Sequence, residues 1–363
     1  GAYRHTRFKT EDVKENPIRE FKIVELRAEK LDSIMEGVRR AQIVGDAVTL
    51  ARDLANEPSN VVTPSYLAEV AEEIAAEADI ECRVWDRGRI EEAGMGLLAA
   101  VARGAAEEPR FIEMIYRSPD ARKTVAIVGK GITFDTGGHS LKASEYMYGM
   151  KDDMAGAGCV LAAMRAVGRL RPKVNVIALI PATENAIGEK AIHPGDVFHS
   201  LDGKTVEVNN TDAEGRLILA DAVAYAAKNG VDEIIDLATL TGACVVALGR
   251  DVAGVFANDH NLADRVLAAG ARCGEHLWRL PLHRPYKKDL KSDIADLKNV
   301  AGREGAAITG ALFIESFVGD VPWAHLDLSS AAITEDTHLS RKGATGIGAG
   351  TLVEYLMESD KDA

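Results

Sequence analysis

Hydrophobic positions recur at two different spacings along the chain, and the spacing distinguishes helices from strands. Between residues 32 and 56 apolar side chains repeat every three or four positions, which predicts an amphipathic helix. Pro58 predicts its end, because proline disfavours helix in the residue before it. Thr63-Pro64 predicts the start of the next helix, with a capping hydroxyl and proline at the first helical position. Residues 217–227, rich in Ala and Leu, predict a further helix.

Short apolar runs between these patterns predict strands. They cover 80–85, 111–116, 125–128, 174–180 and 233–237, with a short helical pattern at 90–93. Strands that alternate with helices predict an α/β fold with a largely parallel central sheet flanked by helices. In such sheets, sites form where loops leave the carboxyl ends of strands. The loop with Lys130 and Asp135 and the loop at 239–242 are therefore candidates.

Two polar stretches lie outside this alternation. Residues 1–30 mix Lys and Glu without periodicity and predict a linker or surface arm. Residues 283–308 are polar and rich in Lys, which predicts a mobile surface segment at the rim of a site or at an oligomer contact.

Composition narrows the class of protein. The 363 residues are 47% hydrophobic and 27% charged, which is ordinary for a soluble globular protein. No apolar run approaches the roughly eighteen residues that span a bilayer. The four cysteines form no C-x-x-C pair, so we expect free thiols in a reducing compartment and a cytoplasmic protein. The net charge of −13 opposes binding to nucleic acid, which needs a basic face.

Two carboxylates and a guanidinium crowd the start of the helix predicted at 217–227. Asp212 and Glu214 are two positions apart and would face different ways on a regular helix. They could share one site if the chain enters the helix there from an extended approach. Acidic residues at a helix start also cap free N–H groups and complement the helix dipole. From spacing alone, capping and metal binding both remain open.

Two sequence blocks resemble one known family. Asn210-Thr211-Asp212-Ala213-Glu214-Gly215-Arg216-Leu217 resembles the signature of the leucyl aminopeptidase family, which are cytosol aminopeptidases with two metal ions. Val128-Gly129-Lys130-Gly131-Ile132-Thr133-Phe134-Asp135-Thr136-Gly137-Gly138, followed by Lys142 and by Met150-Lys151-Asp152-Asp153-Met154, resembles the family's other metal-binding segment. The resemblance covers about 31–357. It implies a dinuclear aminopeptidase-type catalytic domain at 31–363, with 1–30 remaining from an absent N-terminal region.

The resemblance also implies a ligand set and a reaction. The implied metal ligands are Lys130, Asp135, Asp153, Asp212 and Glu214. Four carboxylates in one pocket would repel each other unless cations neutralise them, and two divalent ions would do so. The resemblance implies Zn²⁺ or Mn²⁺, with Mg²⁺ as a further option. A water between the metals would attack the N-terminal peptide bond of peptides with a free N-terminus.

Further roles come from the same resemblance. It implies that Lys142 polarises the scissile carbonyl and that Arg216 holds a bicarbonate that acts as general base, near a helix N-terminus suited to anions. It implies a homo-hexamer and a leucine-type preference. The implied lining of the pocket for the first side chain is Met150, Thr239, Gly242 and Ala332.

Several readings stay open beside these. Lys130 and Lys142 could be surface lysines, and Asp135 could be a turn aspartate. The chain departs from the family pattern at Thr136 and at His139, and His139 could tune Lys142, bind a stray metal or face solvent. A dipeptidase acting on cysteinyl-glycine and a non-catalytic DNA-binding protein are the alternative functions.

Overall fold

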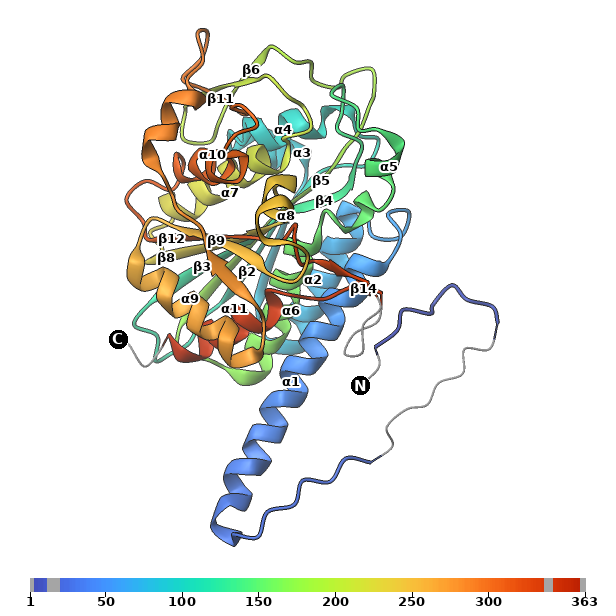
Figure 1. Cartoon of the computed structure of the whole chain (residues 1–363), viewed down its shortest axis with the longest axis vertical. Helices are drawn as coiled ribbons and strands as arrows, with labels where there is room; N and C mark the ends of the chain where they lie inside the picture. Colours follow the sequence, from blue (N-terminus) through green and yellow to red (C-terminus); the bar gives the residue numbers. More distant parts are fainter. Residues whose placement is uncertain (1–2, 12–19, 336–341, 360–363) are drawn as a thin grey trace.

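A nine-stranded sheet runs through the centre of the protein (Figure 1). This computed structural model describes residues 3–11, 20–335 and 342–359. The strands of the sheet are β1 (Glu81–Trp85), β2 (Arg110–Tyr116), β3 (Thr124–Gly129), β4 (Gly131–Asp135), β5 (Asn175–Asn185), β8 (Glu233–Ala238), β9 (Ala253–Ala257), β10 (Leu277–Arg279) and β12 (Trp323–Asp327). Their order is β1-β2-β5-β3-β8-β12-β9-β10, with β4 paired to β5.

The central strands β5, β3, β8 and β12 are parallel to one another. Antiparallel pairs join β1 to β2, β2 to β5 and β9 to β12. The prediction of a largely parallel sheet flanked by helices is therefore confirmed, with antiparallel strands added on both sides. Two small sheets complete the strands, β6 (Asp196–His199), β7 (Thr205–Val208) and β11 (Leu297–Lys298) in one, and β13 (Ile333–Thr334) and β14 (Gly343–Ala344) in the other.

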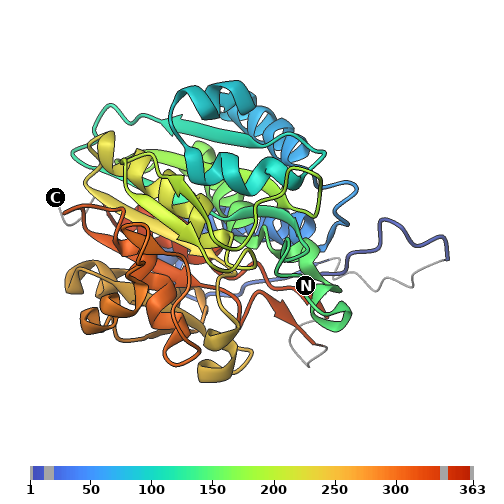
Figure 2. The ribbon, with the colours of Figure 1, turned by 90° about the horizontal axis from the view of Figure 1, so that it is seen from above.

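Helices cover both faces of the sheet (Figure 2). The α-helices are α1 (Leu31–Asn56), α2 (Pro64–Ala78), α3 (Arg87–Glu92), α4 (Gly96–Val101), α5 (Ser144–Met147), α6 (Ala155–Leu170), α7 (Gly215–Lys228), α8 (Gly242–Leu248), α9 (His260–Cys273), α10 (Ala306–Glu315) and α11 (Ala349–Glu358). The 3₁₀ turns are η1 (Ala28–Lys30), η2 (Ala102–Gly104), η3 (Met150–Asp152) and η4 (Arg284–Leu290).

Both faces of the sheet are buried, and alternate strand residues belong to different cores. In β3, Val125 and Ile127 pack with α1, α2, α6 and α11, whereas Ala126 and Val128 pack with α4, α7 and α10. A strand buried on both sides reads as a continuous apolar run. This is why the predicted strands lacked polar alternation.

The predicted helix boundaries hold where capping chemistry marks them. The α2 helix begins at Pro64, and the Thr63 side chain accepts a hydrogen bond of 3.1 Å from the backbone N–H of Tyr66. The first part of α1 is largely exposed and projects from the body (Figure 1), so only its later part, from Ile43 on, packs in the core. Among the described residues, no helix combines the length and apolar character that crossing a bilayer requires.

The predicted arm at 1–30 ends where α1 begins, after the short turn η1. Of this arm, 1–2 and 12–19 lie outside the described residues. Its first part contacts the end of α1, where the Tyr3 hydroxyl donates to Asp53 at 2.6 Å and Arg7 pairs with Glu57 at 2.8 Å. Residues 20–27 contain no helix or strand.

The polar segment 283–308 differs from its prediction. It contains η4 and β11, and β11 pairs with β7. Leu290 and Asn299 are fully buried, so the prediction of a surface segment is wrong for them. The prediction followed the lysines of this segment, which are exposed or half-exposed, and so it missed the two buried positions beside them.

The parallel strands deliver polar residues to one edge of the sheet. Lys130 follows β3, Asp135 ends β4 and Asn185 ends β5. Thr239 follows β8, and Asp327 ends β12. Carboxyl ends of parallel strands meet at the same edge, so these side chains come from distant parts of the sequence to one place.

Candidate metal centre

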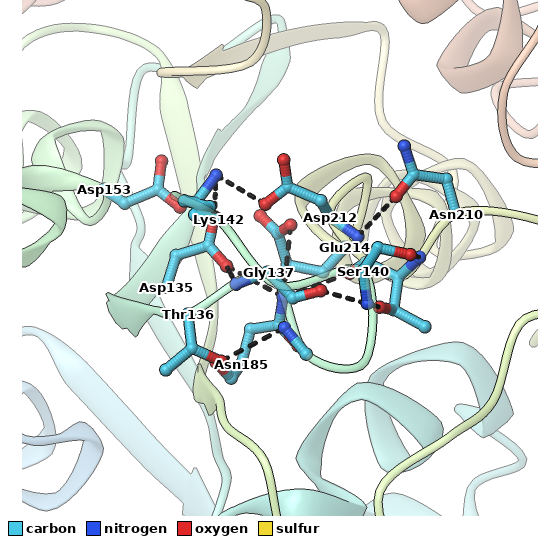
Figure 3. Close-up of polar contacts among 12 residues, drawn as sticks. Asp135, Thr136, Gly137, Ser140, Lys142, Asp153, Asn185, Asn210, Asp212 and Glu214 are labelled. Atoms are coloured by element: carbon cyan, nitrogen blue, oxygen red, sulfur yellow. Dashed lines mark hydrogen bonds and ion pairs between the residues drawn. The ribbon is translucent and has the colours of Figure 1, made fainter. Parts of the chain in front are cut away.

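Four carboxylates and two lysines meet at this edge, and Figure 3 shows the carboxylates with one of the lysines, Lys142. Oxygen atoms of Asp135, Asp212 and Glu214 all lie within 4.8 Å of one another. Lys130, Lys142 and Asp153 join them through ion pairs. The structure thus brings together six residues that the sequence placed in one site.

Lys130 lies at the bottom of the cluster. Its Nζ is 2.7 Å from Asp153 Oδ1 and 2.9 Å from Glu214 Oε1, and it donates to the Thr239 carbonyl at 3.1 Å. The residue is 3% exposed, which rules out the surface-lysine reading. A buried ammonium with three acceptors is held by charge rather than by solvent.

Lys142 bridges two loops at the mouth of the cluster. Its Nζ is 2.8 Å from Asp135 Oδ2 and 2.5 Å from Asp212 Oδ1. The loop between them turns sharply at Gly137, whose φ of +84° favours glycine. A Cβ there would lie 2.8 Å from Asp212 Oδ1, so no larger residue fits.

The contacts at 212–215 distinguish between the two roles that the sequence left open for Asp212 and Glu214, helix capping and metal binding. Glu214 precedes α7 and makes no capping hydrogen bond through its side chain, because its carboxylate faces Lys130 instead. A Cβ at Gly215 would come within 2.4 Å of Lys130 Cε, so glycine is required for this approach. Asp212 likewise directs its carboxylate to Lys142. The metal-site reading is the one that this geometry favours.

Asp135 is both a turn aspartate and a member of the cluster. Its Oδ1 accepts a hydrogen bond of 2.8 Å from the Gly137 N–H, which is a turn contact. Its Oδ2 belongs to the cluster through Lys142. The turn therefore orients the carboxylate that the site uses.

Asn185 is a site residue that the sequence reasoning missed. Its Nδ2 donates to Asp135 Oδ1 at 2.8 Å, to the Thr211 carbonyl at 3.0 Å and to Glu214 Oε2 at 3.4 Å. It thereby orients two carboxylates of the cluster, one from β4 and one from the start of α7. No local signal marked it, because Asn185 lies five residues beyond the end of the predicted strand 174–180.

Burial and charge oppose each other in the cluster. Burial raises the pKa of Asp135 to about 6. For Glu214, burial raises the pKa, but the charges of Lys130 and Lys142 outweigh it and lower the pKa below its ordinary value. For both lysines, burial lowers the pKa, but the surrounding carboxylates outweigh it and raise the pKa. The surrounding carboxylates therefore keep both lysines protonated.

The donor set fits divalent metal ions. Carboxylate oxygens are hard ligands, and buried carboxylates that crowd together need cations. Asp153 Oδ2 is buried and has no hydrogen-bond partner, so it is available to a cation. Lys130 could bind a metal only after losing its proton, because an ammonium has no free electron pair.

Arg216 provides a second kind of site on the first turn of α7. Its side chain is buried, Nη1 donates to the Asn299 carbonyl at 2.8 Å, and Nε has no hydrogen-bond partner. Burial lowers the pKa of Arg216 to about 10. Among residues 3–11, 20–335 and 342–359, no carboxylate forms an ion pair within 4.0 Å of its guanidinium, although the charges of Glu214 and Asp327 act on it from farther away.

Comparison with known proteins identifies the family. The cytosol aminopeptidase family, catalytic domain, matches residues 49–353. The chain belongs to the cytosol aminopeptidase family. This makes it a metal-dependent exopeptidase, an enzyme that hydrolyses peptides from the N-terminus, and the family resemblance read from the two sequence blocks is confirmed.

Individual relatives agree with this identification. A probable cytosol aminopeptidase of Syntrophotalea carbinolica is 46% identical over 361 residues, which is 98% of this chain and 72% of that protein. One from Geobacter sulfurreducens is 52% identical over 314 residues, which is 86% of this chain and 63% of that protein. The solved bottromycin maturation enzyme BotP in complex with Mn has a TM-score of 0.91 and 38% identity, and the match covers 98% of this chain and 76% of that one.

Of the four residues expected to line a substrate pocket in this aminopeptidase, one makes a hydrogen bond to the six clustered residues. Thr239 joins the cluster, since its hydroxyl donates to Asp153 Oδ1 at 2.7 Å. Met150 begins η3, Gly242 begins α8, and Ala332 is buried in the turn before β13. Within the described part of the chain, no side-chain hydrogen bond or ion pair connects these last three to the six clustered residues.

His139 faces outward at the rim. The residue is exposed. Its Nδ1 lies 2.8 Å from the Ile192 carbonyl oxygen, and its ring stacks on that of His193 with 4.7 Å between the ring centroids. These contacts fit the solvent-facing reading, and no contact with Lys142 is present in the described structure.

Proposed function

We propose that this aminopeptidase removes N-terminal residues, with a leucine-type preference, from peptides with a free N-terminus. The observation that carries the proposal is the buried cluster of four carboxylates around two lysines. The proposed metal ligands are Lys130, Asp135, Asp153, Asp212 and Glu214. Two divalent ions, Zn²⁺ or Mn²⁺ with Mg²⁺ as a further option, would activate a water and polarise the scissile carbonyl.

Each ligand has a contact that the ion would replace. Lys130 would give up its proton and its contacts with Asp153 and Glu214, and its amine would become a neutral donor. Asn185 keeps its hydrogen bonds to Asp135 and Glu214, so those two carboxylates stay oriented when their lysine partners move.

Lys142 has the position of an electrostatic stabiliser. It is charged at neutral pH because the carboxylates raise its pKa. Its side chain is 15% exposed, against 4% for Lys130, so it lies nearer to an entering substrate. An ammonium aimed at the carbonyl oxygen stabilises the negative charge that develops there.

Arg216 is the proposed holder of a bicarbonate. Its unpartnered Nε and the N-terminus of α7 favour an anion at this place. A bicarbonate held there would accept a proton from the attacking water as a general base.

The first side chain of the substrate is proposed to contact Met150, Thr239, Gly242 and Ala332. A Cβ added at Gly242 would meet no atom within 4 Å, which leaves open space beside the cluster loop. An apolar first residue suits a pocket with methionine and alanine in its wall.

The requirement for a free amine gives the sharpest test of the proposed substrate. We expect turnover of leucinamide and no detectable turnover of N-acetyl-leucinamide, because the acetyl group removes the basic amine. Equal turnover of the two compounds would overturn the exopeptidase mechanism.

Assembly and location are also proposals. We propose a homo-hexamer in the cytoplasm, in keeping with relatives that are named cytosol aminopeptidases. A monomeric mass in light scattering at micromolar concentration would refute the hexamer.

A further inference from the structure

A buried carboxylate outside the cluster, Asp327, accepts hydrogen bonds from the loop at 239–241. Asp327 ends β12, beside Ala238 at the end of β8, and is fully buried. Its Oδ1 accepts from the backbone N–H groups of Leu240 at 3.3 Å, Thr241 at 3.4 Å and Ser329 at 3.2 Å. Its Oδ2 accepts from the Thr241 hydroxyl at 2.7 Å.

The loop held in this way is also the loop that contacts two proposed ligands. The Thr239 carbonyl accepts from Lys130 Nζ at 3.1 Å, and the Thr239 hydroxyl donates to Asp153 Oδ1 at 2.7 Å. Leu240 and Thr241 follow directly in the chain. A shift of their backbone would therefore move both contacts of Thr239.

Two further hydrogen bonds join the ends of β8 and β12 to each other and to the loop. The Leu328 N–H donates to the Ala238 carbonyl at 2.7 Å, and the Ser329 hydroxyl accepts from the Thr241 N–H at 3.0 Å. Asp327 belongs to β12 and accepts hydrogen bonds from the loop, so it connects the strand to the loop directly. A charged acceptor makes hydrogen bonds roughly twice as strong as a neutral one.

We propose that Asp327 is a positioning residue that fixes Lys130 and Asp153 for metal binding through the loop 239–241. Asp327 makes no hydrogen bond to the six clustered residues within the described structure. The proposal rests on the proposed metal ligands. Groups that orient ligands alter metal affinity by about 10-fold to 100-fold when they are replaced.

The test compares Asp327→Asn with a matched buried carboxylate. Glu275 accepts from the N–H groups of Gly348, Gly350 and Thr351 at the start of α11, away from the cluster. Mn²⁺ affinity is measured by competition with a chromogenic chelator on the full chain. We expect D327N to weaken Mn²⁺ binding by about 10-fold or more and E275Q to leave it unchanged, although both lower the melting temperature.

A second pair of variants covers the case in which D327N does not fold. Thr241→Val removes the hydroxyl that donates to Asp327, and Thr241→Ser keeps it. We expect weaker Mn²⁺ binding for T241V than for T241S. We also expect excess Mn²⁺ to restore the kcat of T241V more than its KM.

The outcomes separate the two proposals. No Mn²⁺ binding by the wild-type protein would overturn the proposed function and this inference together. Tight binding by the wild type with unchanged affinity in D327N, or in T241V where D327N fails to fold, would overturn the role of Asp327 alone.

Discussion

Glu214 connects Lys130 with Asn185 inside the cluster. One carboxylate oxygen pairs with Lys130 and the other accepts from Asn185, and this carboxylate is one of the proposed metal ligands. Replacement by glutamine keeps the shape and removes the charge, so it isolates the electrostatic contribution.

We therefore predict that Glu214→Gln lowers kcat by at least about 100-fold and reduces the number of bound Mn²⁺ ions. The measurements are hydrolysis of leucinamide and metal content after gel filtration. Glu36→Gln, on the exposed part of α1, is the matched control and should match the wild type. Full activity of E214Q would exclude Glu214 as a ligand.

Arg216 tests a different part of the mechanism. Lysine keeps a positive charge but loses the planar fork that matches a bicarbonate. We predict that Arg216→Lys lowers kcat by about 10-fold to 100-fold and weakens the dependence of rate on added bicarbonate. Rates in carbonate-free buffer with bicarbonate titrated back provide the measurement. An R216K enzyme with the bicarbonate response of the wild type would contradict the assignment.

At the residue scale, local sequence motifs identified the residues of the cluster but not the residues that orient them. Lys130, Asp135 and Glu214 stand in two quoted motifs, and their chemistry was readable. Asn185 and Asp327 were not singled out, because each acts through contacts more than twenty residues away in the chain. Nothing in a local pattern says which distant strand end will lie beside it.

The helix α7 is the element on which the site depends most. It carries Arg216 on its first turn, and its buried Asp221 accepts from the N–H groups of Leu97 and Leu98 at 2.9 Å and of Leu201 at 2.8 Å. Burial raises the pKa of Asp221 to about 7, although these N–H groups lower it. Asp221 therefore ties α7 to α4 and to the loop after β6.

This raised pKa predicts a pH dependence of stability. The pKa of Asp221 is about 3.9 in the unfolded chain and about 7 in the folded protein, so the folded protein holds the proton more tightly. Its contribution is fully present below pH 4 and is lost as pH rises to 7. We predict that the stability of the wild type falls relative to Asp221→Asn between these values.

Urea unfolding at several pH values measures this difference. Asp46→Asn, at an exposed position that pairs with Arg169, is the control and should follow the wild type. Parallel stability curves for D221N and the wild type would show that Asp221 does not titrate in this range.

At the element scale, long periodic patterns were read well and very short strands were not. The helices α1, α2 and α7 begin and end close to the predicted positions, because periodicity and caps mark them. The strands β10 and β11 contain three and two residues, too few for any alternation to show. Their pairing is set by the sheet edge that they meet rather than by their own sequence.

The whole molecule should respond to metal through its stability. Ions that bind the folded state alone stabilise it by about 2.7 kcal/mol for each site at 100 times the dissociation constant. We predict that chelation lowers the melting temperature of the wild type and that Mn²⁺ restores it. The same titration on E214Q should give a much smaller shift. An equal shift in both proteins would place the stabilising ions elsewhere.

The fold and family were predictable from the chain, and the assembly stays a prediction. The α/β alternation indicated the sheet, and the two motifs indicated the family. The order of strands required the three-dimensional structure, because it joins segments that are distant in the chain. So did the contact between Arg216 and the Asn299 carbonyl, which are 83 residues apart.

The measurement that tests the central claim most directly is hydrolysis of leucine p-nitroanilide by the purified protein. The protein is first treated with a chelator, and then Mn²⁺, Zn²⁺ or Mg²⁺ is added back. We predict that chelation abolishes release of p-nitroaniline and that at least one of these ions restores it. Activity that survives complete removal of metal, or no activity with any ion despite tight binding, would contradict a metal-dependent aminopeptidase built on this cluster.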